Sequence, residues 1–322
     1  MLRSIESRAS RRVRRHMTVV GFAALSILGP GVAQAGCSAP VAVQVLGSGG
    51  PVSDDARASS GYLVWIDGEA RLLIDAGGGV FLRFGEAKAK FETLDAIAIT
   101  HLHADHVTDL AAILKSGFFS DRKRPLPIIG PTGSPAFPGM RTYMHALFDA
   151  RHGAYRYLSG YLDGSGGLAK AEIAEISAKS EKPQKAFANA AFKLSAVGVM
   201  HGPVPALGYV VEVRGRKFAF SGDQGGDNPD FTAMIEGADI LVMDHAVPED
   251  AGLVEAALHD RPSEIGKLAK AANVKKLVLS HNMARSLNVL PKNLATIAEH
   301  YTGSTVVADD LMCFAPDGDA RK

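Results

Sequence analysis

Three histidines and one aspartate lie within six residues directly after an apolar run, and this feature constrains the chain most. The segment reads T-H-L-H-A-D-H from residue 100 and follows the apolar residues 94–99. Residues two apart in a strand share a face, so His101 and His103 can hold one ion, while Asp105 and His106 on the turn point toward a second. A solvated histidine-rich loop would not need a buried strand before it. The motif therefore predicts a two-metal site at a strand end.

The donor types indicate which metals to expect and which reaction they support. Imidazole nitrogen with carboxylate oxygen suits zinc first, and manganese or iron as alternatives. Two such ions can share a hydroxide, lower its pKa toward neutrality and polarise the oxygen of a bound ester. Metal-dependent hydrolysis is the expected reaction.

Apolar runs rich in valine and isoleucine alternate with glycine-rich breaks, as strands and turns do. A helical spacing of apolar residues in segment 104–116 places the histidine cluster where a strand ends and a helix begins. We expect residues 36–322 to form one α/β domain. The predicted strands cover residues 41–46, 61–66, 71–74, 94–100, 191–200, 207–213, 217–221, 240–243 and 276–280, with a second helix over 263–272.

The segment 140–185 is polar and glycine-rich and shows little periodicity, which predicts an insertion or a lid. It contains Tyr155, Tyr157 and Tyr161, for which solvent-facing positions or core packing are the expected roles.

The first 35 residues predict export. Six arginines precede an apolar run over residues 19–32, which ends in Ala33-Gln34-Ala35, the order of a secretory signal peptide cleaved after Ala35. The run is shorter than the roughly 20 apolar residues that span a bilayer, so no stable membrane anchor is expected. The string Ser10-Arg11-Arg12 resembles a twin-arginine signal. The expected location is periplasmic or secreted.

Cysteine content and net charge leave two questions open. Cys37 and Cys313 are the two cysteines, and they form either one disulfide or two separate thiols. A formal net charge of +1 provides no overall attraction to nucleic acid or to a membrane surface. A homodimer is compatible with the sequence.

The pattern H-x-H-x-D-H after a strand resembles the hallmark of the metallo-β-lactamase superfamily, and its other motifs follow in order. The string L-G-S-G-G-P at 46–51, with Arg57 and S-S-G at 59–61, resembles the ribonuclease Z and arylsulfatase branch. L-I-D-A-G at 73–77, M-H-G at 200–202, S-G-D at 221–223 and S-H-N at 280–282 resemble the remaining motifs. The resemblance spans residue 41 to about residue 314 and implies a four-layer αβ/βα sandwich.

The resemblance also implies a role for each motif residue. It gives His101, His103 and His201 to the first ion. It gives Asp105, His106 and His281 to the second ion, with Asp223 bridging both.

Other residues receive supporting roles from the same resemblance. His259, within L-H-D at 258–260, is the candidate proton donor, and Asp105 is the other candidate catalytic residue; a histidine that merely begins a helix is the alternative for His259. The resemblance makes Asp75 structural and suggests that Asp244 orients a ligand imidazole.

The substrate is expected to be a small phosphodiester or aryl sulfate ester. Ribonuclease Z carries a long basic arm between its lone-histidine motif and its aspartate motif, whereas 21 residues separate His201 from Asp223 here. With the export signal, this argues for a small-molecule ester and against nucleic acid. A β-lactamase or lactonase is the enzymatic alternative, and a non-catalytic metal-binding protein is the alternative from another class.

Overall fold

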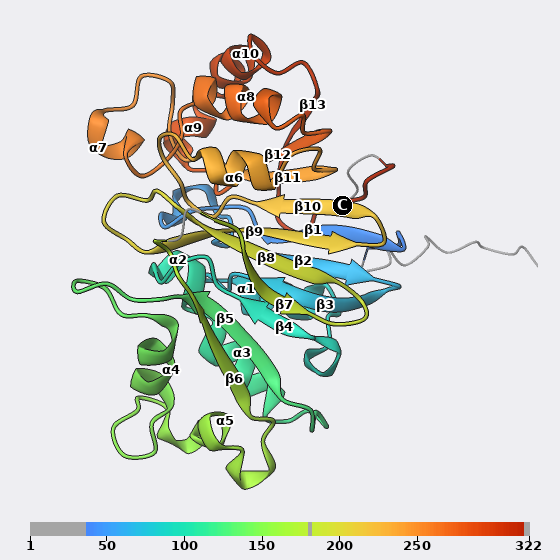
Figure 1. Cartoon of the computed structure of the whole chain (residues 1–322), viewed down its shortest axis with the longest axis vertical. Helices are drawn as coiled ribbons and strands as arrows, with labels where there is room; N and C mark the ends of the chain where they lie inside the picture. Colours follow the sequence, from blue (N-terminus) through green and yellow to red (C-terminus); the bar gives the residue numbers. More distant parts are fainter. Residues whose placement is uncertain (1–36, 180–181, 319–322) are drawn as a thin grey trace, which may run out of the picture. The chain divides into compact units, whose positions relative to one another are not determined.

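The computed structural model describes residues 37–179 and 182–318 (Figure 1). The predicted signal peptide, residues 1–35, lies outside the described residues. No helix within the described part of the chain has both the length and the apolar character needed to cross a membrane.

Within the described residues, the strands form two seven-stranded sheets of related design. The first sheet has the order β14-β1-β2-β3-β4-β5-β6, with antiparallel pairs up to β3 and parallel pairs from β3 to β6. Its strands are β1 (Val41–Gly47), β2 (Gly61–Ile66), β3 (Glu69–Ile74), β4 (Ala96–Ala98), β5 (Leu126–Pro131), β6 (Ala171–Ile176) and β14 (Cys313–Phe314).

The second sheet repeats this arrangement with the order β13-β12-β11-β10-β9-β8-β7. Strands β7 to β10 pair antiparallel, and β10 to β13 pair parallel. Its strands are β7 (Gln184–Ala188), β8 (Lys193–Val199), β9 (Ala206–Val213), β10 (Arg216–Phe220), β11 (Ile240–Asp244), β12 (Lys276–Ser280) and β13 (Ser304–Val307).

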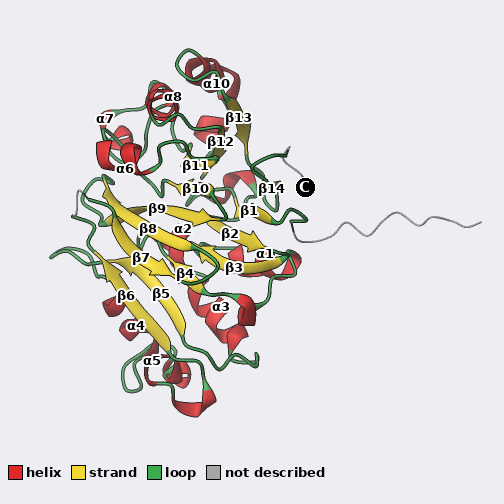
Figure 2. Ribbon diagram, turned by 45° about the vertical axis from the view of Figure 1, so that its right-hand side comes forward, coloured by secondary structure: helices red, strands yellow, loops and turns green. Residues whose placement is uncertain are grey.

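Three apolar cores separate four layers, which confirms the predicted αβ/βα sandwich. The alternation along β1 shows why: Val43 and Val45 face the other sheet, whereas Ala42 and Leu46 face helices. Figure 2 shows the sheets between one helix group that includes α3 and α4 and another that includes α8 and α10. The helices are α1 (Val80–Glu86), α2 (Ala104–Val107), α3 (Leu110–Gly117), α4 (Met140–Phe148), α5 (Gly160–Asp163), α6 (Pro229–Met234), α7 (Leu253–Ala256), α8 (Pro262–Ala271), α9 (Ala284–Leu287) and α10 (Leu290–Ala298).

The expectation of an insertion or lid over residues 140–185 needs correction, because this segment is built into the first sheet. It contributes α4, α5 and the edge strand β6, which pairs parallel with β5. Met140, Met144 and Phe148 are fully buried in the core beneath the sheet. Tyr161 is also buried and donates a hydrogen bond to Leu114 O at 2.7 Å. Tyr155 and Tyr157 are exposed, and they lie on a segment that forms part of the first sheet and its helices.

The open question about the cysteines is answered by the structure. Cys37 and Cys313 form a disulfide, with their Cα atoms 5.7 Å apart. Cys313 lies in β14, which pairs with β1 at the edge of the first sheet. The bond thus joins the two ends of the described chain across one sheet edge.

Candidate metal centre

The predicted site residues meet at the ends of strands from both sheets. The histidine cluster follows β4, Asp223 follows β10 and His281 follows β12, whereas His201 begins the connection from β8 to β9. Because parallel strands end at the same edge of a sheet, these distant segments converge. The helix expected over residues 104–116 is divided into α2 and α3 at residues 108–109.

The first group consists of three imidazoles whose ring nitrogens face one another. His103 Nδ1 lies 3.0 Å from His101 Nε2 and 3.2 Å from His201 Nε2. Asp223 Oδ2 lies 3.9 Å from both of those Nε2 atoms. Burial lowers the pKa of His101 well below its usual range and that of His201 to about 4. Neutral imidazoles are the form that binds a metal ion.

The second group combines two imidazoles with two carboxylates. His281 Nε2 lies 3.1 Å from Asp105 Oδ2 and 3.2 Å from Asp223 Oδ2. His106 Nε2 lies 3.3 Å from Asp223 Oδ1 and 3.6 Å from Asp105 Oδ2. Asp223 therefore borders both groups, in the position that a bridging ligand requires.

Protonation differs in the second group because of its carboxylates. Burial opposes the charged form of both imidazoles, but Asp223 raises the pKa of His106 well above its usual range. Asp223 and Asp105 likewise outweigh burial and raise the pKa of His281 to about 10. Without metal ions, two protonated imidazoles thus balance the negative charge of two carboxylates. Bound divalent cations can provide this positive charge instead, once the imidazoles have lost their protons.

These residues fit a pair of divalent cations. In each group the candidate ligand atoms all lie within 4.8 Å of one another. His106 Nε2 and Asp223 Oδ1 are buried and lie 3.3 Å apart, and neither atom makes a hydrogen bond within the described residues. Buried polar atoms without partners are rare, and they call for a ligand that accepts electron pairs. The structure brings all seven candidates together; their assignment as ligands stays a prediction.

Groups behind the cluster fix the orientation of its imidazoles. Asp75 Oδ2 lies 2.8 Å from His106 Nδ1, and the same carboxyl group accepts hydrogen bonds from the Thr100 backbone N–H and hydroxyl. His201 Nδ1 lies 2.9 Å from Leu258 O. Such contacts direct the other ring nitrogen toward the metal position. Asp75 was expected to be structural, and in the structure it lies against the His106 ring behind the cluster.

His259 lies beside the cluster and is paired with Asp244. His259 Nδ1 is 2.9 Å from Asp244 Oδ2, and its ring centroid is 5.3 Å from that of His281 and 5.6 Å from that of His201. Burial lowers the pKa of His259 to about 4, whereas burial together with Asp223 raises the pKa of Asp244 well above its usual range. Without bound ions the shared proton therefore lies on Asp244. Nδ1 accepts it, and the ring's own proton is on Nε2.

This pairing replaces the role that the sequence suggested for Asp244. The expected partner was an imidazole among the ligands, and the structure instead places His259 there. No sequence spacing indicates the pair, because the two residues are 15 positions apart in the chain, with helix α7 between them.

The sequence analysis also missed a buried network that supports the His281 loop. His245 Nδ1 lies 2.9 Å from Asn282 Oδ1, and Asn293 Nδ2 lies 3.0 Å from His245 Nε2. Asn282 follows His281 directly, so the network holds the end of β12. The polar residues His245 and Asn282, which come directly after the apolar strands β11 and β12, are the sequence feature that could have indicated this network.

The glycine-rich loop after β1 packs against the same place. A Cβ atom on Gly50 would lie 2.8 Å from His281 Cε1, so the close approach requires glycine. Arg57 Nη1 donates to Ser48 Oγ at 2.8 Å and pairs with Asp309 Oδ1 at 2.7 Å. The glycine-rich loop after β1, which resembles a motif of the ribonuclease Z and arylsulfatase branch, therefore forms one wall of the centre.

The remaining histidines stay apart from the centre. Among the described residues, none of the possible metal-binding groups includes His145, His152 or His300.

Comparisons with known proteins agree with this geometry. A family model described as a beta-lactamase superfamily domain matches residues 70–282, the range that holds all seven candidate ligands. The ribonuclease Z of Methanosarcina mazei is 29% identical over 294 residues, which cover 83% of this chain and 95% of that protein.

Solved structures share the fold at low sequence identity. Human tRNase Z, short form, aligns with a TM-score of 0.66 at 22% identity and covers 86% of this chain and 100% of its own. The metallo-beta-lactamase fold protein YhfI from Bacillus subtilis aligns with a TM-score of 0.65 at 20% identity, with the same coverage.

The expectation of a small-molecule ester, with no nucleic acid, is wrong in the light of these relatives. The ribonuclease Z of Methanosarcina mazei, which matches 83% of this chain, acts on RNA by its name, and so does the human structural neighbour. The connection between His201 and Asp223, from which the small-molecule substrate was predicted, is short and holds β9, β10 and a tight hairpin. Loss of an arm changes how a polymer is held and leaves the metal chemistry intact, so it does not exclude RNA.

Proposed function

The chain belongs to the beta-lactamase superfamily and is a metal-dependent hydrolase of the ribonuclease Z-like branch. We propose that it hydrolyses phosphodiester bonds in RNA. The observation that carries the proposal is the His259–Asp244 pair beside the metal cluster. Hydrolysis of an RNA phosphodiester releases a sugar oxygen, which needs a proton as the bond breaks. The substrate class rests on the ribonuclease relatives.

The cluster provides the attacking side of the reaction. Bound divalent cations supply a water molecule with a lowered pKa and polarise the phosphoryl oxygens. Asp223 and Asp105 contribute the negative charge that holds such cations, while Asp75 keeps the His106 ring in one orientation. The tyrosine-rich segment 155–161 has no role in this scheme.

His259 provides the departing side of the reaction. Its Nδ1 is engaged with Asp244, so Nε2 is the ring nitrogen that can give a proton to the departing oxygen. Asp244 fixes this tautomer and can resupply the proton at Nδ1. Asp244 is in this scheme a positioning residue, because it acts through His259.

An apolar surface lies beside the centre and can accept nucleotide bases. Leu253 and Val254 on α7 are 85% and 76% exposed, and Met200, which precedes the ligand candidate His201, is 49% exposed. The Gly202 N–H donates to Ala257 O at 3.1 Å, which ties the end of α7 to the His201 loop. Exposed aliphatic side chains next to a phosphodiester site can make apolar contact with the face of a base, whichever base it is.

We further propose that the protein is exported and that its ions are zinc. The disulfide between Cys37 and Cys313 supports export, since disulfides persist in oxidising compartments. Detection of a mature N-terminus at Gly36 in the periplasmic or secreted fraction tests the first point. Elemental analysis of protein purified from its native host, with manganese and iron measured beside zinc, tests the second.

One experiment tests the catalytic proposal directly. The metal-loaded protein is incubated with an end-labelled single-stranded RNA, a DNA of the same sequence, a chromogenic bis-aryl phosphate and a chromogenic β-lactam. We expect chelator-sensitive cleavage of the RNA and of the bis-aryl phosphate. The control is His103→Ala protein purified in parallel, which reveals any contaminating ribonuclease.

Other outcomes would contradict the proposal. Hydrolysis of the β-lactam alone would show that the protein is a β-lactamase. Full metal loading without turnover of any probe would favour a non-catalytic metal-binding protein. RNA cleavage that the His103→Ala preparation retains would come from a contaminant.

A further inference from the structure

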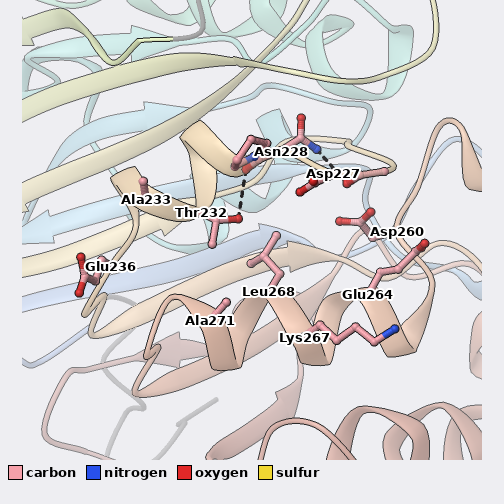
Figure 3. Close-up of a pocket in the computed structure, with 12 residues that line it drawn as sticks. Asp227, Asn228, Thr232, Ala233, Glu236, Asp260, Glu264, Lys267, Leu268 and Ala271 are labelled. Carbon is pink, nitrogen blue, oxygen red and sulfur yellow. Dashed lines mark hydrogen bonds between the residues drawn. The ribbon is translucent and has the colours of Figure 1, made fainter.

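A cavity of about 500 Å³ lies between α6 and α8, away from the predicted ligands (Figure 3). None of the seven candidate ligands lines it. It nevertheless borders the loops that carry them, because the Asp260 N–H donates to Gln224 O at 2.8 Å and Asn228 Oδ1 accepts from the Met200 N–H at 2.8 Å. A molecule in this cavity would occupy a second site, separate from the substrate.

The cavity wall is acidic. Four of the lining residues carry a carboxyl group and one, Lys267, carries an ammonium group. Glu264 is partly engaged, since its Oε2 accepts the Arg261 N–H at 2.7 Å. The exposed carboxylates of Asp227 and Glu236 form no ion pair within the described residues. The balance of charge favours a cation.

Asp260 is the part of this wall that points to a ligand. It is 1% exposed, and Figure 3 shows its carboxyl group between the Asp227 loop and α8. Its Oδ2 accepts a hydrogen bond from Gln224 Nε2 at 3.3 Å, while Oδ1 is buried without a partner among the described residues. A buried carboxyl oxygen without a donor destabilises the protein, and a ligand N–H would remove that cost.

The carboxyl groups lie at two ends of the cavity. Asp227, Asp260 and Glu264 gather at one end and Glu236 lies at the other (Figure 3). The two ends are separated by most of α8, since Glu264 is in its first turn and Ala271 ends it. Seven residues of α helix correspond to about 10 Å.

The middle of the cavity is mainly apolar, and the Thr232 hydroxyl there already donates to Asn228 O at 3.1 Å. Ala233 of α6 and Leu268 and Ala271 of α8 line the stretch between the two acidic ends (Figure 3). Methylene groups would contact this stretch favourably, whereas a hydrated metal ion would gain nothing from it. The cavity thus has acidic ends and an aliphatic centre.

We propose that this cavity binds an elongated aliphatic polyamine, with one ammonium group at Asp260 and Glu264 and another at Glu236. Ammonium groups carry only donors, which matches a wall of carboxylate acceptors. A chain that spans about 10 Å along α8 reaches both ends, and a short diamine reaches one. Lys267 lies on the same wall and weakens the site by like-charge repulsion.

Calorimetric titration of the metal-loaded protein with spermidine tests this site, with the short diamine putrescine and Mg²⁺ as comparison ligands. Glu236→Gln should weaken spermidine binding about fivefold and leave putrescine binding unchanged, because only the longer amine reaches that end. Glu264→Gln, which keeps a side chain able to cap α8, should weaken both amines. Glu172→Gln, on the exposed face of β6, removes the same charge elsewhere and should change neither.

Three results would overturn the proposal. Equal effects of Glu236→Gln and Glu172→Gln would mean general attraction to charge, and displacement of spermidine by equimolar Mg²⁺ would identify a metal site. Loss of spermidine binding in His103→Ala would place the amine in the metal centre. Because the titration measures binding alone, its outcome does not depend on whether RNA is the substrate.

Discussion

At the scale of single residues, the imidazoles of the centre differ in which ring nitrogen they present to the cluster. His101, His201, His106 and His281 present Nε2 to the cluster, whereas His103 presents Nδ1. His259 directs Nδ1 to Asp244 instead, and this leaves its outer nitrogen for a substrate. Residues of one type therefore have two predicted roles, which substitution can distinguish.

His103→Ala should lose bound metal and activity together, because its Nδ1 is central to the first group. His259→Ala should keep its metal and lose about 10²- to 10⁴-fold in kcat, the usual contribution of a general acid. Elemental analysis beside steady-state kinetics on one preparation of each variant measures both quantities. Metal loss in both variants would contradict this division of roles.

Asp244→Asn should lower kcat about 10- to 100-fold while the metal content is kept, since an amide can still donate a hydrogen bond to His259 Nδ1 but cannot resupply a proton there. The pH profile of kcat is the decisive readout, because a proton donor with an altered partner titrates at a different pH. An Asp244→Asn protein with an unchanged profile and lower stability would show that Asp244 is merely structural.

At the scale of elements, close backbone contacts bring the strand-end loops together. A Cβ atom on Gly77 would lie 2.0 Å from the backbone oxygen of Asp105, and the Ala76 N–H donates to His106 O at 2.7 Å. The loop after β3 is therefore pressed against the start of α2, where the ligand candidates lie. Residue Asp75 in this loop has a φ of 57°, a left-handed conformation that these contacts support.

Gly77→Ala should displace α2 and lower metal affinity at least tenfold, because the new methyl group meets backbone that cannot rotate away. Gly85→Ala in α1 is the matched control: its Cβ meets nothing within 4 Å, and it should stabilise the helix by about 0.5–1 kcal/mol. Metal titration and thermal unfolding of both variants provide the comparison. Equal metal affinity in the two proteins would refute the role of this contact.

The segment 140–185 shows why an element can be missed. Its polar residues dominate the composition, yet the three buried residues of α4, Met140, Met144 and Phe148, are spaced by four and form one helical face. Such a stripe is too narrow to stand out from a polar and glycine-rich background. Only the tertiary structure shows that this apolar face of α4 packs against the first sheet.

At the scale of the whole molecule, the disulfide links the beginning and the end of the described chain at the β14 edge of the first sheet. Cys37 precedes β1, Cys313 lies in β14, and 276 residues separate them in sequence. The bond stabilises the fold chiefly by restricting the unfolded chain.

Cys313→Ser should lower the free energy of unfolding by about 2–5 kcal/mol while the native protein still binds metal. Urea unfolding with and without reductant measures this, and reductant should affect the original protein alone. The double variant Cys37→Ser/Cys313→Ser should match the single variant, because both remove the same bond. A larger loss in the double variant would mean that one cysteine packs favourably without it.

The fold family, the hydrolase class and the side chains to test as ligands all follow from the amino-acid sequence alone. This is possible because a metal requires particular donor atoms, and strand and turn geometry sets the spacing of His101, His103, Asp105 and His106 within one short segment. The tertiary structure alone decided which distant residues meet: His259 with Asp244, Cys37 with Cys313, and the two acidic ends of the cavity between α6 and α8. Those contacts depend on strand order and register, which many weak packing interactions set together and no local spacing records.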